Sequence, residues 1–188
     1  MKIATLLPYK ENYTISKAQA AAIWVCDFYK YSKFKDNNFI YGNTPTKDYL
    51  TKNYVNIEIS NLKSKLTSST KEYCKNFIKK NIKDNFDIIE IHNRPLVYKY
   101  LKNEVDTKYI LYFHNDPISM HGSKTRSERL DLLDNVDKII FVSKWVQDRF
   151  FVDLDKKLIN KTEIVYPSIH KSKIKLVKNN NITFVGKL

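Results

Sequence analysis

The sequence has few of the residues that build special loops. Its 188 residues include only 3 Gly, 5 Pro and 2 Cys. So few glycines exclude collagen-like and Gly-rich linker proteins, and neither the G-x-G-x-x-G fingerprint of an ordinary dinucleotide site nor a P-loop is present. Cys26 and Cys74 lie far apart in helical patterns, without a CxxC or Cys/His spacing. We interpret them as buried thiols and not as zinc ligands.

Long hydrophobic runs are missing as well. The apolar segment 3–7 is too short for the core of a signal peptide, and no stretch approaches the roughly 18–20 apolar residues of a spanning helix. We therefore expect a soluble, cytoplasmic protein. Hydrophobic residues nevertheless make up 43% of the chain and aromatic residues 13%. That content is enough for a folded core and is not typical of intrinsic disorder.

Acidic residues are outnumbered by basic ones. The 33 Lys and Arg residues against 20 Asp and Glu residues give a formal charge of +13, which indicates anionic partners such as nucleic acid, a phosphorylated substrate or a membrane face. The base composition of the gene is a plainer explanation of this charge. Lys outnumbers Arg and Asn is abundant, which is the pattern that AT-rich codons produce. A dedicated nucleic-acid binder uses Arg more often, so nucleic acid is the less favoured partner.

Short apolar runs alternate with helical patterns along the chain. The strands that this pattern predicts are 3–7, 39–41, 54–59, 87–91, 109–113, 138–142, 162–166 and 182–185. The expected helices run from a capping box at Ser16 to about residue 29 and over 69–83, 95–102, 127–133 and 144–151. Near-continuous apolar strands between helices form parallel sheets covered on both faces. We therefore predict an α/β fold with a doubly wound, Rossmann-like parallel sheet.

The same pattern predicts the domain organisation. Residues 1–169 form the expected Rossmann-like domain, and the polar, lysine-rich segment 170–181 is the expected linker. Residues 182–188 contain one further strand, which cannot fold by itself. We expect this strand to begin a second domain and the sequence to be truncated.

Polar residues gather where predicted strands end. In an open parallel sheet, ligands bind outside the carboxyl ends of the strands. Two ends carry His-Asn: His92-Asn93, followed by Arg94, and His114-Asn115. Neutral His hydrogen-bonds a hydroxyl near pH 7, Asn suits sugar hydroxyls, and Arg94 at a helix start holds a phosphate or carboxylate. The alternative interpretation is that each His only caps its loop.

Two further candidates lie at other strand ends. Tyr9 follows the first strand, and Ser143 follows the strand 138–142, where it also fits the cap of the next helix. His114 and Asp116 are too few for a metal site, so we expect no metal.

The order of these segments resembles a known family. The segments that carry the resemblance are MKI at 1–3, DIIEIHNRP at 87–95, YFHND at 112–116, VDKIIFVS at 136–143, IVYPS at 164–168 and ITFVGKL at 182–188. Together they are similar to the N-terminal half of a GT-B glycosyltransferase of family 4, the type common in lipopolysaccharide and other surface-glycan synthesis. The resemblance covers almost the whole chain.

The resemblance implies a function. In the family, two Rossmann-like domains face each other across a cleft, the C-terminal one holding the sugar nucleotide and the N-terminal one mainly the acceptor. It implies a retaining enzyme that needs no metal and no cofactor beyond its nucleotide-sugar substrate. Such an enzyme moves a hexose to a glycan or lipid-linked acceptor. His114 aligns with the family's histidine that contacts the donor sugar near the reacting centre, which makes it the expected catalytic residue.

The first loop of the family contacts donor phosphate or acceptor. It maps to residues 9–16, where the family's usual Gly pair is absent, so the expected substitute is Ser16 or Lys17 at the helix start. The residues to which we assign acceptor or donor binding are Tyr9, Ser16, Lys17, His92, Asn93, Arg94, Asn115 and Ser143. This half alone is expected to be inactive, because half of the cleft is missing. The family's donor-binding carboxylates belong to the other half, so none is assigned here.

Two other hypotheses stay open. One is a non-enzymatic basic α/β module that binds nucleic acid or an acidic polymer, although the basic residues are scattered and no RNA-binding motif occurs. The other, compatible with a transferase, is peripheral contact with an anionic inner membrane face. The lysines that would make this contact are Lys63, Lys65, Lys71, Lys75, Lys79, Lys80 and Lys83. An ordinary solvated helix face is the favoured explanation of these lysines, since exposed Lys is common.

Overall fold

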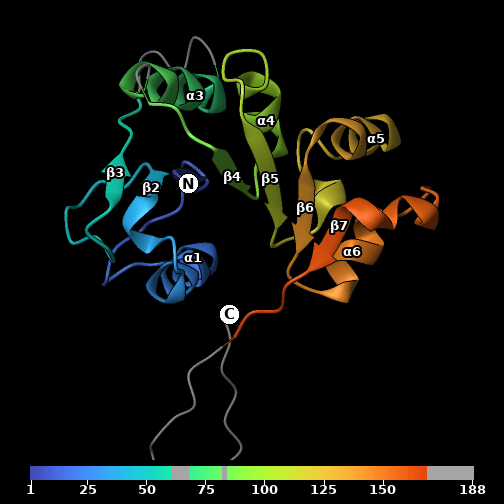
Figure 1. The fold of residues 1–188 in the computed structure, drawn as a ribbon, viewed down its shortest axis with the longest axis horizontal. Coiled ribbons are helices and arrows are strands. Elements are labelled where there is room, and N and C mark those ends of the chain that lie inside the picture. The colour runs from blue at the N-terminus through green and yellow to red at the C-terminus, as the bar shows by residue number, and fades with distance from the viewer. Residues whose placement is uncertain (61–67, 82–83, 169–188) are drawn as a thin grey trace, which may run out of the picture.

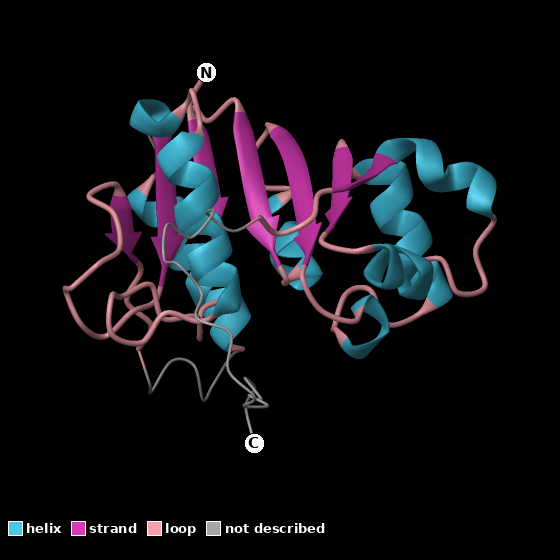
Figure 2. Cartoon of the chain, turned by 90° about the horizontal axis from the view of Figure 1, so that it is seen from below, coloured by secondary structure: helices cyan, strands magenta, loops and turns pink. Residues whose placement is uncertain are grey.

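The chain folds around one parallel sheet. The computed structural model describes residues 1–60, 68–81 and 84–168; the expected linker at 170–181 and the expected strand at 182–188 lie outside these ranges. Within the described part, a 7-stranded sheet has the order β3-β2-β1-β4-β5-β6-β7, and Figure 2 shows its arrowheads pointing in one direction. The doubly wound, Rossmann-like α/β fold predicted from the alternating pattern is confirmed.

The bounds of the elements follow the apolar runs closely. The strands are β1 (Ile3–Leu6), β2 (Asn38–Gly42), β3 (Tyr54–Asn56), β4 (Ile88–His92), β5 (Lys108–Phe113), β6 (Lys138–Phe141) and β7 (Thr162–Ile164). The helices are α1 (Ala20–Tyr31), α3 (Ser69–Lys80), α4 (Pro95–Leu101), α5 (Arg126–Asn135) and α6 (Lys144–Phe150). Short 3-10 turns cover Lys35–Asn37, Pro117–Ser119 and Lys156–Lys161.

The strand order reverses beside β1. The chain runs from β1 through β2 to β3 at one edge and then returns to β4 on the other side of β1. All four residues of β1 are buried, and Ala4 lies opposite Phe39 on one side and Ile89 on the other. Because ligands bind where the order of such a sheet reverses, the carboxyl ends of β1 and β4 are the first place to look for a site.

Helices cover the two faces of the sheet. In Figure 1, α1 lies on the opposite side of the sheet from α3 and α4. Ala22 and Val25 of α1 belong to the smaller apolar cluster, with Ile40 and Tyr112 of the sheet. The other face packs against α3, α4, α5 and α6 in the larger cluster. Each large apolar side chain buried in this way contributes roughly 1.5–3 kcal/mol to the stability of the fold. The cysteines Cys26 and Cys74 are buried thiols, as predicted.

The start of α1 differs from the prediction. The capping box predicted a helix beginning at Ser16, but α1 begins at Ala20 with Gln19 as its N-cap. Ser16 is exposed, and its hydroxyl donates to Asp48 Oδ2 at 3.1 Å. A bridge between Thr14 and Tyr49 holds the same segment. The predicted cap was wrong because contacts distant in sequence keep this segment in a turn ahead of the helix.

Other helix ends agree better with their sequence signals. Pro95 is the first residue of α4, as predicted. Ser143 caps α6, its hydroxyl accepting from the backbone N–H of Val146 at 3.3 Å. The cap of α3 is Ser68, whose hydroxyl accepts from Lys71 N at 3.1 Å, one residue before the predicted box at Ser69.

Candidate functional site

The carboxyl ends of β1, β4 and β5 bring predicted site residues together. Tyr9 follows β1, Asn93 and Arg94 follow β4, and Asn115 follows β5. All four line one open pocket of about 340 Å³. The residues that complete its lining are Thr70, Leu96, Ser119, Met120 and His121.

The lining of this pocket, which we call the strand-end pocket, is polar and basic. Arg94 is half-buried, and its Nη1 donates to the backbone oxygen of Asn93 at 3.0 Å. Among the described residues that line the pocket, none is acidic. Guanidinium groups bind carboxylates and phosphates, while hydroxyls and amides suit sugar hydroxyls. The pocket can therefore hold a polar ligand that carries a negative group.

Asn93 ties the end of β4 to the loop after β5. Its backbone N–H donates to Tyr112 O at 2.8 Å, and its Oδ1 accepts from the backbone N–H groups of His114 at 2.7 Å and Asn115 at 3.3 Å. Its φ of 53° lies in the left-handed region, where Asn is among the most tolerated residues. The structure thus uses the side-chain oxygen of this predicted ligand residue to shape the loop that carries His114.

The two strand-end histidines are hydrogen-bonded to each other. Nδ1 of His92 lies 2.9 Å from Nε2 of His114. His92 is 1% exposed and stacks on Tyr112 with a centroid distance of 4.5 Å and an interplanar angle of 6°. Trp24 of α1 places its ring edge-on against both histidines, at 5.6 Å from His92 and 5.1 Å from His114. Aromatic contacts therefore hold both imidazoles in place.

Both histidines are neutral at physiological pH. Burial lowers the pKa of His92 well below its usual value, and the neighbouring His114 lowers it further. Burial also lowers the pKa of His114 to about 4. Since an imidazolium pair would repel and lose hydration, the hydrogen bond joins two neutral rings. One ring donates the proton and the other accepts it.

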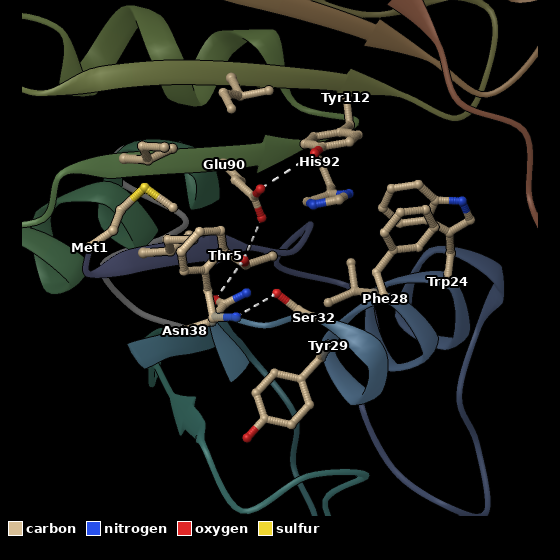
Figure 3. A pocket seen from close by; sticks show the side chains of 15 residues that line it. Met1, Thr5, Trp24, Phe28, Tyr29, Ser32, Asn38, Glu90, His92 and Tyr112 are labelled. Carbon is tan, nitrogen blue, oxygen red and sulfur yellow. Dashed lines mark hydrogen bonds between the residues drawn. The ribbon is translucent and has the colours of Figure 1, made fainter. Parts of the chain in front are cut away.

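A second cavity lies against the α1 face of the sheet (Figure 3). It measures about 230 Å³, and its walls include Glu90, His92 and Trp24. Thr5 Oγ1 donates to Glu90 Oε2 at 2.7 Å, and Tyr112 Oη donates to Glu90 Oε1 at 3.3 Å. Burial raises the pKa of Glu90, which these two hydrogen bonds partly offset. His92 thus lies between this cavity and His114.

Glu11 is a buried carboxylate that sequence reasoning did not single out. It is 9% exposed, and its Oε1 accepts from the backbone N–H of Ala22 in the first turn of α1 at 3.1 Å. Burial raises its pKa, while hydrogen bonds to Ala22 and Ala21 and the charge of Arg94 lower it. A carboxylate of the protein therefore occupies the helix terminus at which we expected a phosphate. No local spacing reveals this contact, because a loop separates Glu11 from the helix.

Besides His92 and His114, three predicted site residues lie outside the strand-end pocket. The Ser16 hydroxyl donates a hydrogen bond to Asp48. Lys17 is exposed, and its backbone N–H donates to the hydroxyl of Thr14. Ser143 serves as the cap of α6. The described part of the chain thus joins Tyr9, Asn93, Arg94 and Asn115 in one pocket, with the histidine pair directly behind Asn93.

The loop after β5 forms one wall of the pocket and is held at two points. Arg149 of α6 donates from Nη2 to Asp116 Oδ2 at 2.9 Å, and this bond is the main reason why the pKa of Asp116 is lowered. Gly122 has a φ of 95°, and a Cβ there would lie 2.8 Å from the backbone nitrogen of Leu96. Only glycine allows this close approach to the start of α4. His121 is set on the pocket wall by this packing, and no sequence signal marked it.

Two general properties of the described residues bear on function. They contain no group of three or more His, Cys, Asp and Glu side chains that could hold a metal ion. In the same part of the chain, no helix is both long and apolar enough to cross a membrane.

Similarity to known proteins is found at the level of structure. No family model and no curated protein matches the sequence. Sucrose-phosphate synthase from Thermosynechococcus elongatus superposes with a TM-score of 0.59 at 12% identity, over 88% of this chain and 47% of the synthase. HepE from Anabaena, in complex with UDP, gives 0.59 at 14% identity, over 90% and 44% of the two chains. The lipopolysaccharide outer core galactosyltransferase WaaB gives 0.59 at 13% identity, over 93% and 48%.

These neighbours are GT-B glycosyltransferases, and the chain has the Rossmann-like fold of their domains. The predicted resemblance to GT-B proteins is confirmed at the level of the fold. The chain spans a little under half the length of each of these three neighbours, whereas it covers 88% of a shorter form of the synthase.

Proposed function

We propose that this chain is the N-terminal half of a retaining, metal-independent glycosyltransferase of family 4. The enzyme moves a hexose from a nucleotide sugar to a glycan or lipid-linked acceptor. The observation that carries the proposal is the strand-end pocket beside the neutral His114, at the switch point of a fold shared with glycosyltransferases. A buried neutral imidazole next to a pocket of amides, hydroxyls and a guanidinium suits sugar hydroxyls better than a hydrophobic or metal ligand.

In this proposal the donor sugar and the acceptor are bound by different residues. His114 contacts a hydroxyl of the donor sugar and stabilises the transition state by fixed electrostatic positioning. Tyr9, Arg94 and Asn115 hold the acceptor in the strand-end pocket. Arg94 is the group that takes an acceptor phosphate or carboxylate.

The nucleotide belongs to a second domain in this proposal. HepE was crystallised with UDP, which supports a nucleoside diphosphate sugar as the donor class. Residues 1–169 supply the acceptor side of the cleft, residues 170–181 the linker, and residues 182–188 the first strand of the donor-binding domain. The 188-residue chain alone is then inactive, because it lacks half of the cleft.

A chimaera tests the proposal. The chain is joined to the part of WaaB that it does not cover, since WaaB is a galactosyltransferase. Transfer of labelled galactose from a nucleotide-activated donor to a glycan acceptor is measured, and NMR gives the anomeric configuration of the product. The His114→Ala chimaera is expected to lose about 100-fold to 1000-fold in kcat, the usual effect of removing one preorganised donor. Asn103→Ala, an exposed residue after α4, is the control. Unchanged transfer by the His114→Ala chimaera would reject the assigned role.

Membrane contact is a separate part of the proposal. Lys71, Lys75 and Lys79 are exposed and recur every four residues along α3, so they share one helix face that suits anionic head groups at the inner, cytoplasmic membrane surface. Lys63, Lys65 and Lys83 lie outside the described residues. Flotation with vesicles of neutral lipid, with and without anionic lipid, tests this contact against a triple Lys→Gln variant. Binding to RNA or DNA at low salt in a gel shift would instead favour the basic-module hypothesis.

A further inference from the structure

The hydrogen bond between His92 and His114 needs a single proton with a definite position. Nδ1 of His92 and Nε2 of His114 lie 2.9 Å apart, and both rings are neutral at pH 7 because burial lowers both pKa values. Each neutral imidazole carries one N–H and one bare nitrogen. Either His92 or His114 therefore donates the proton of this bond. If His92 donates, Nδ1 of His114 carries a proton and is a hydrogen-bond donor; if His114 donates, its Nδ1 is bare and is an acceptor.

The other nitrogen of His92 decides between them. Nε2 of His92 is fully buried and has no hydrogen-bond partner among the residues that the structure describes. If His92 accepted at Nδ1, its proton would be on Nε2, as a buried N–H without an acceptor. Orphaned buried N–H groups are rare, whereas buried acceptors with spare lone pairs are better tolerated. The proton of His92 is therefore on Nδ1, in the bond to His114.

The surroundings of His92 prevent the ring from changing this arrangement. The ring is stacked on Tyr112 at an interplanar angle of 6° and meets the edge of Trp24. Flipping the imidazole would move its nitrogens away from His114. The backbone N–H of His114 is bonded to Asn93 Oδ1 at 2.7 Å, and its ring meets Trp24 edge-on at 5.1 Å. Packing therefore restricts both rings.

We propose that His92 is a positioning residue that donates its Nδ1–H to Nε2 of His114 and thereby fixes His114 as the Nδ1–H tautomer. The effect of this tautomer on catalysis rests on the proposed function, in which His114 contacts the donor sugar. In this tautomer the free nitrogen of His114 carries a proton. His114 therefore selects a hydrogen-bond acceptor, such as the oxygen of a sugar hydroxyl, and stabilises negative charge that develops on it.

The tautomer is measured directly on this chain. The protein is labelled with ¹⁵N-histidine, and two-bond proton–nitrogen NMR correlations distinguish the protonated from the bare nitrogen of each ring at neutral pH. The His114→Gln and His92→Asn spectra assign the signals. In the wild type we expect a proton on Nδ1 of both His92 and His114. A proton on Nε2 of His114 would overturn the proposal, because His92 would then be the acceptor.

Two variants separate positioning from simple packing. His92→Asn retains an amide N–H near the place of Nδ1 and is expected to keep His114 as the Nδ1–H tautomer. His92→Leu removes the donor, and His114 is expected to move its proton to Nε2. An unchanged tautomer in a folded His92→Leu protein contradicts the proposal. If that variant does not fold, the wild-type spectrum alone decides.

Transfer by the chimaera provides the functional readout. His92→Leu is expected to lower kcat by about 10-fold to 100-fold, the range for residues that orient a reacting group, and His92→Asn to restore most of it. The NMR result needs no sugar nucleotide. If His114 is the Nδ1–H tautomer but the chimaera transfers no sugar, the proposed function is rejected and the role of His92 stands. If the chimaera transfers sugar but His114 is the Nε2–H tautomer, the role of His92 is rejected and the proposed function stands.

Discussion

Oε1 of Glu11 accepts a hydrogen bond of 3.1 Å from the backbone N–H of Ala22, so a side chain of the first loop closes the N-terminus of α1. The charge of Arg94 acts on the same carboxyl group. The first loop, the first helix and the end of β4 are thereby connected at the site. The anionic group at this helix terminus is part of the protein, so under the proposed function an anionic ligand is expected at Arg94 in the strand-end pocket and not at the start of α1.

Removing the Glu11 carboxylate is expected to loosen the start of α1. Glu11→Ala leaves a buried backbone N–H unpaired and should lower the free energy of unfolding by about 1 kcal/mol, as for the loss of a helix cap. Glu11→Gln retains an acceptor oxygen and should lose less. Urea denaturation followed by circular dichroism measures both. Equal stability of Glu11→Ala and the wild type would show that the hydrogen bond does not contribute.

Asn93 combines a side-chain role with a backbone role, and two variants separate them. Asn93→Gly keeps the left-handed φ accessible but removes the acceptor for His114 and Asn115, so we expect a loss of about 1–3 kcal/mol for two hydrogen bonds. Asn93→Ala adds the strain of a Cβ at a φ of 53° and should lose about 1 kcal/mol more. The difference between their unfolding free energies is the measurement. A more stable Ala variant would contradict the assigned strain.

The neutral histidine pair predicts a loss of stability in weak acid. The folded pKa of His114 is about 4, against 6.5 for an ordinary histidine. Between these values the unfolded chain binds protons that the folded chain does not. The free energy of unfolding therefore falls as the pH drops, by up to about 1.4 kcal/mol per pH unit for each histidine.

Denaturation at several pH values checks this slope. His114→Gln removes one titrating ring and should make the profile shallower between about pH 6.5 and 4. A wild-type profile that is flat over this range would mean that the two rings are not held neutral by the fold.

Gly122 is expected to tolerate no side chain. A Cβ at this position would lie 2.8 Å from the nitrogen of Leu96 and 3.1 Å from the carbonyl carbon of Pro95, and φ is 95°. Gly122→Ala should therefore lower the free energy of unfolding by about 2 kcal/mol or more and weaken ligand binding in the strand-end pocket. Thermal unfolding measures the first effect.

Gly42 provides a matched glycine control. A Cβ at Gly42 would lie 2.6 Å from the hydroxyl oxygen of Tyr54, but this atom is the end of a side chain and not backbone, and Gly42 has no positive φ. Gly42→Ala should therefore be the milder change. The reverse order of stability would show that the loop after β5 adapts more easily than its packing on α4 indicates.

Local pattern was sufficient for most elements of the fold. Strands such as β4 and β5 are apolar runs because parallel strands are buried on both faces, and such a run is visible without any knowledge of its partners. The helix starts at Pro95 and after Ser143 were equally visible, because a cap acts within three residues. The start of α1 was not, since Asp48 and Glu11 act on that region from distant parts of the chain.

The candidate site shows the same division. The sequence alone was enough to place His92, Asn93, Arg94 and His114 at strand ends, because strand ends are local features of the pattern. That His92 and His114 touch was decided by the tertiary structure: β4 and β5 are parallel neighbours whose register sets His92 beside Tyr112, two residues before His114. Register depends on the packing of whole strands and helices. The two histidines were therefore separate candidates in the sequence and became a hydrogen-bonded pair only in the folded chain.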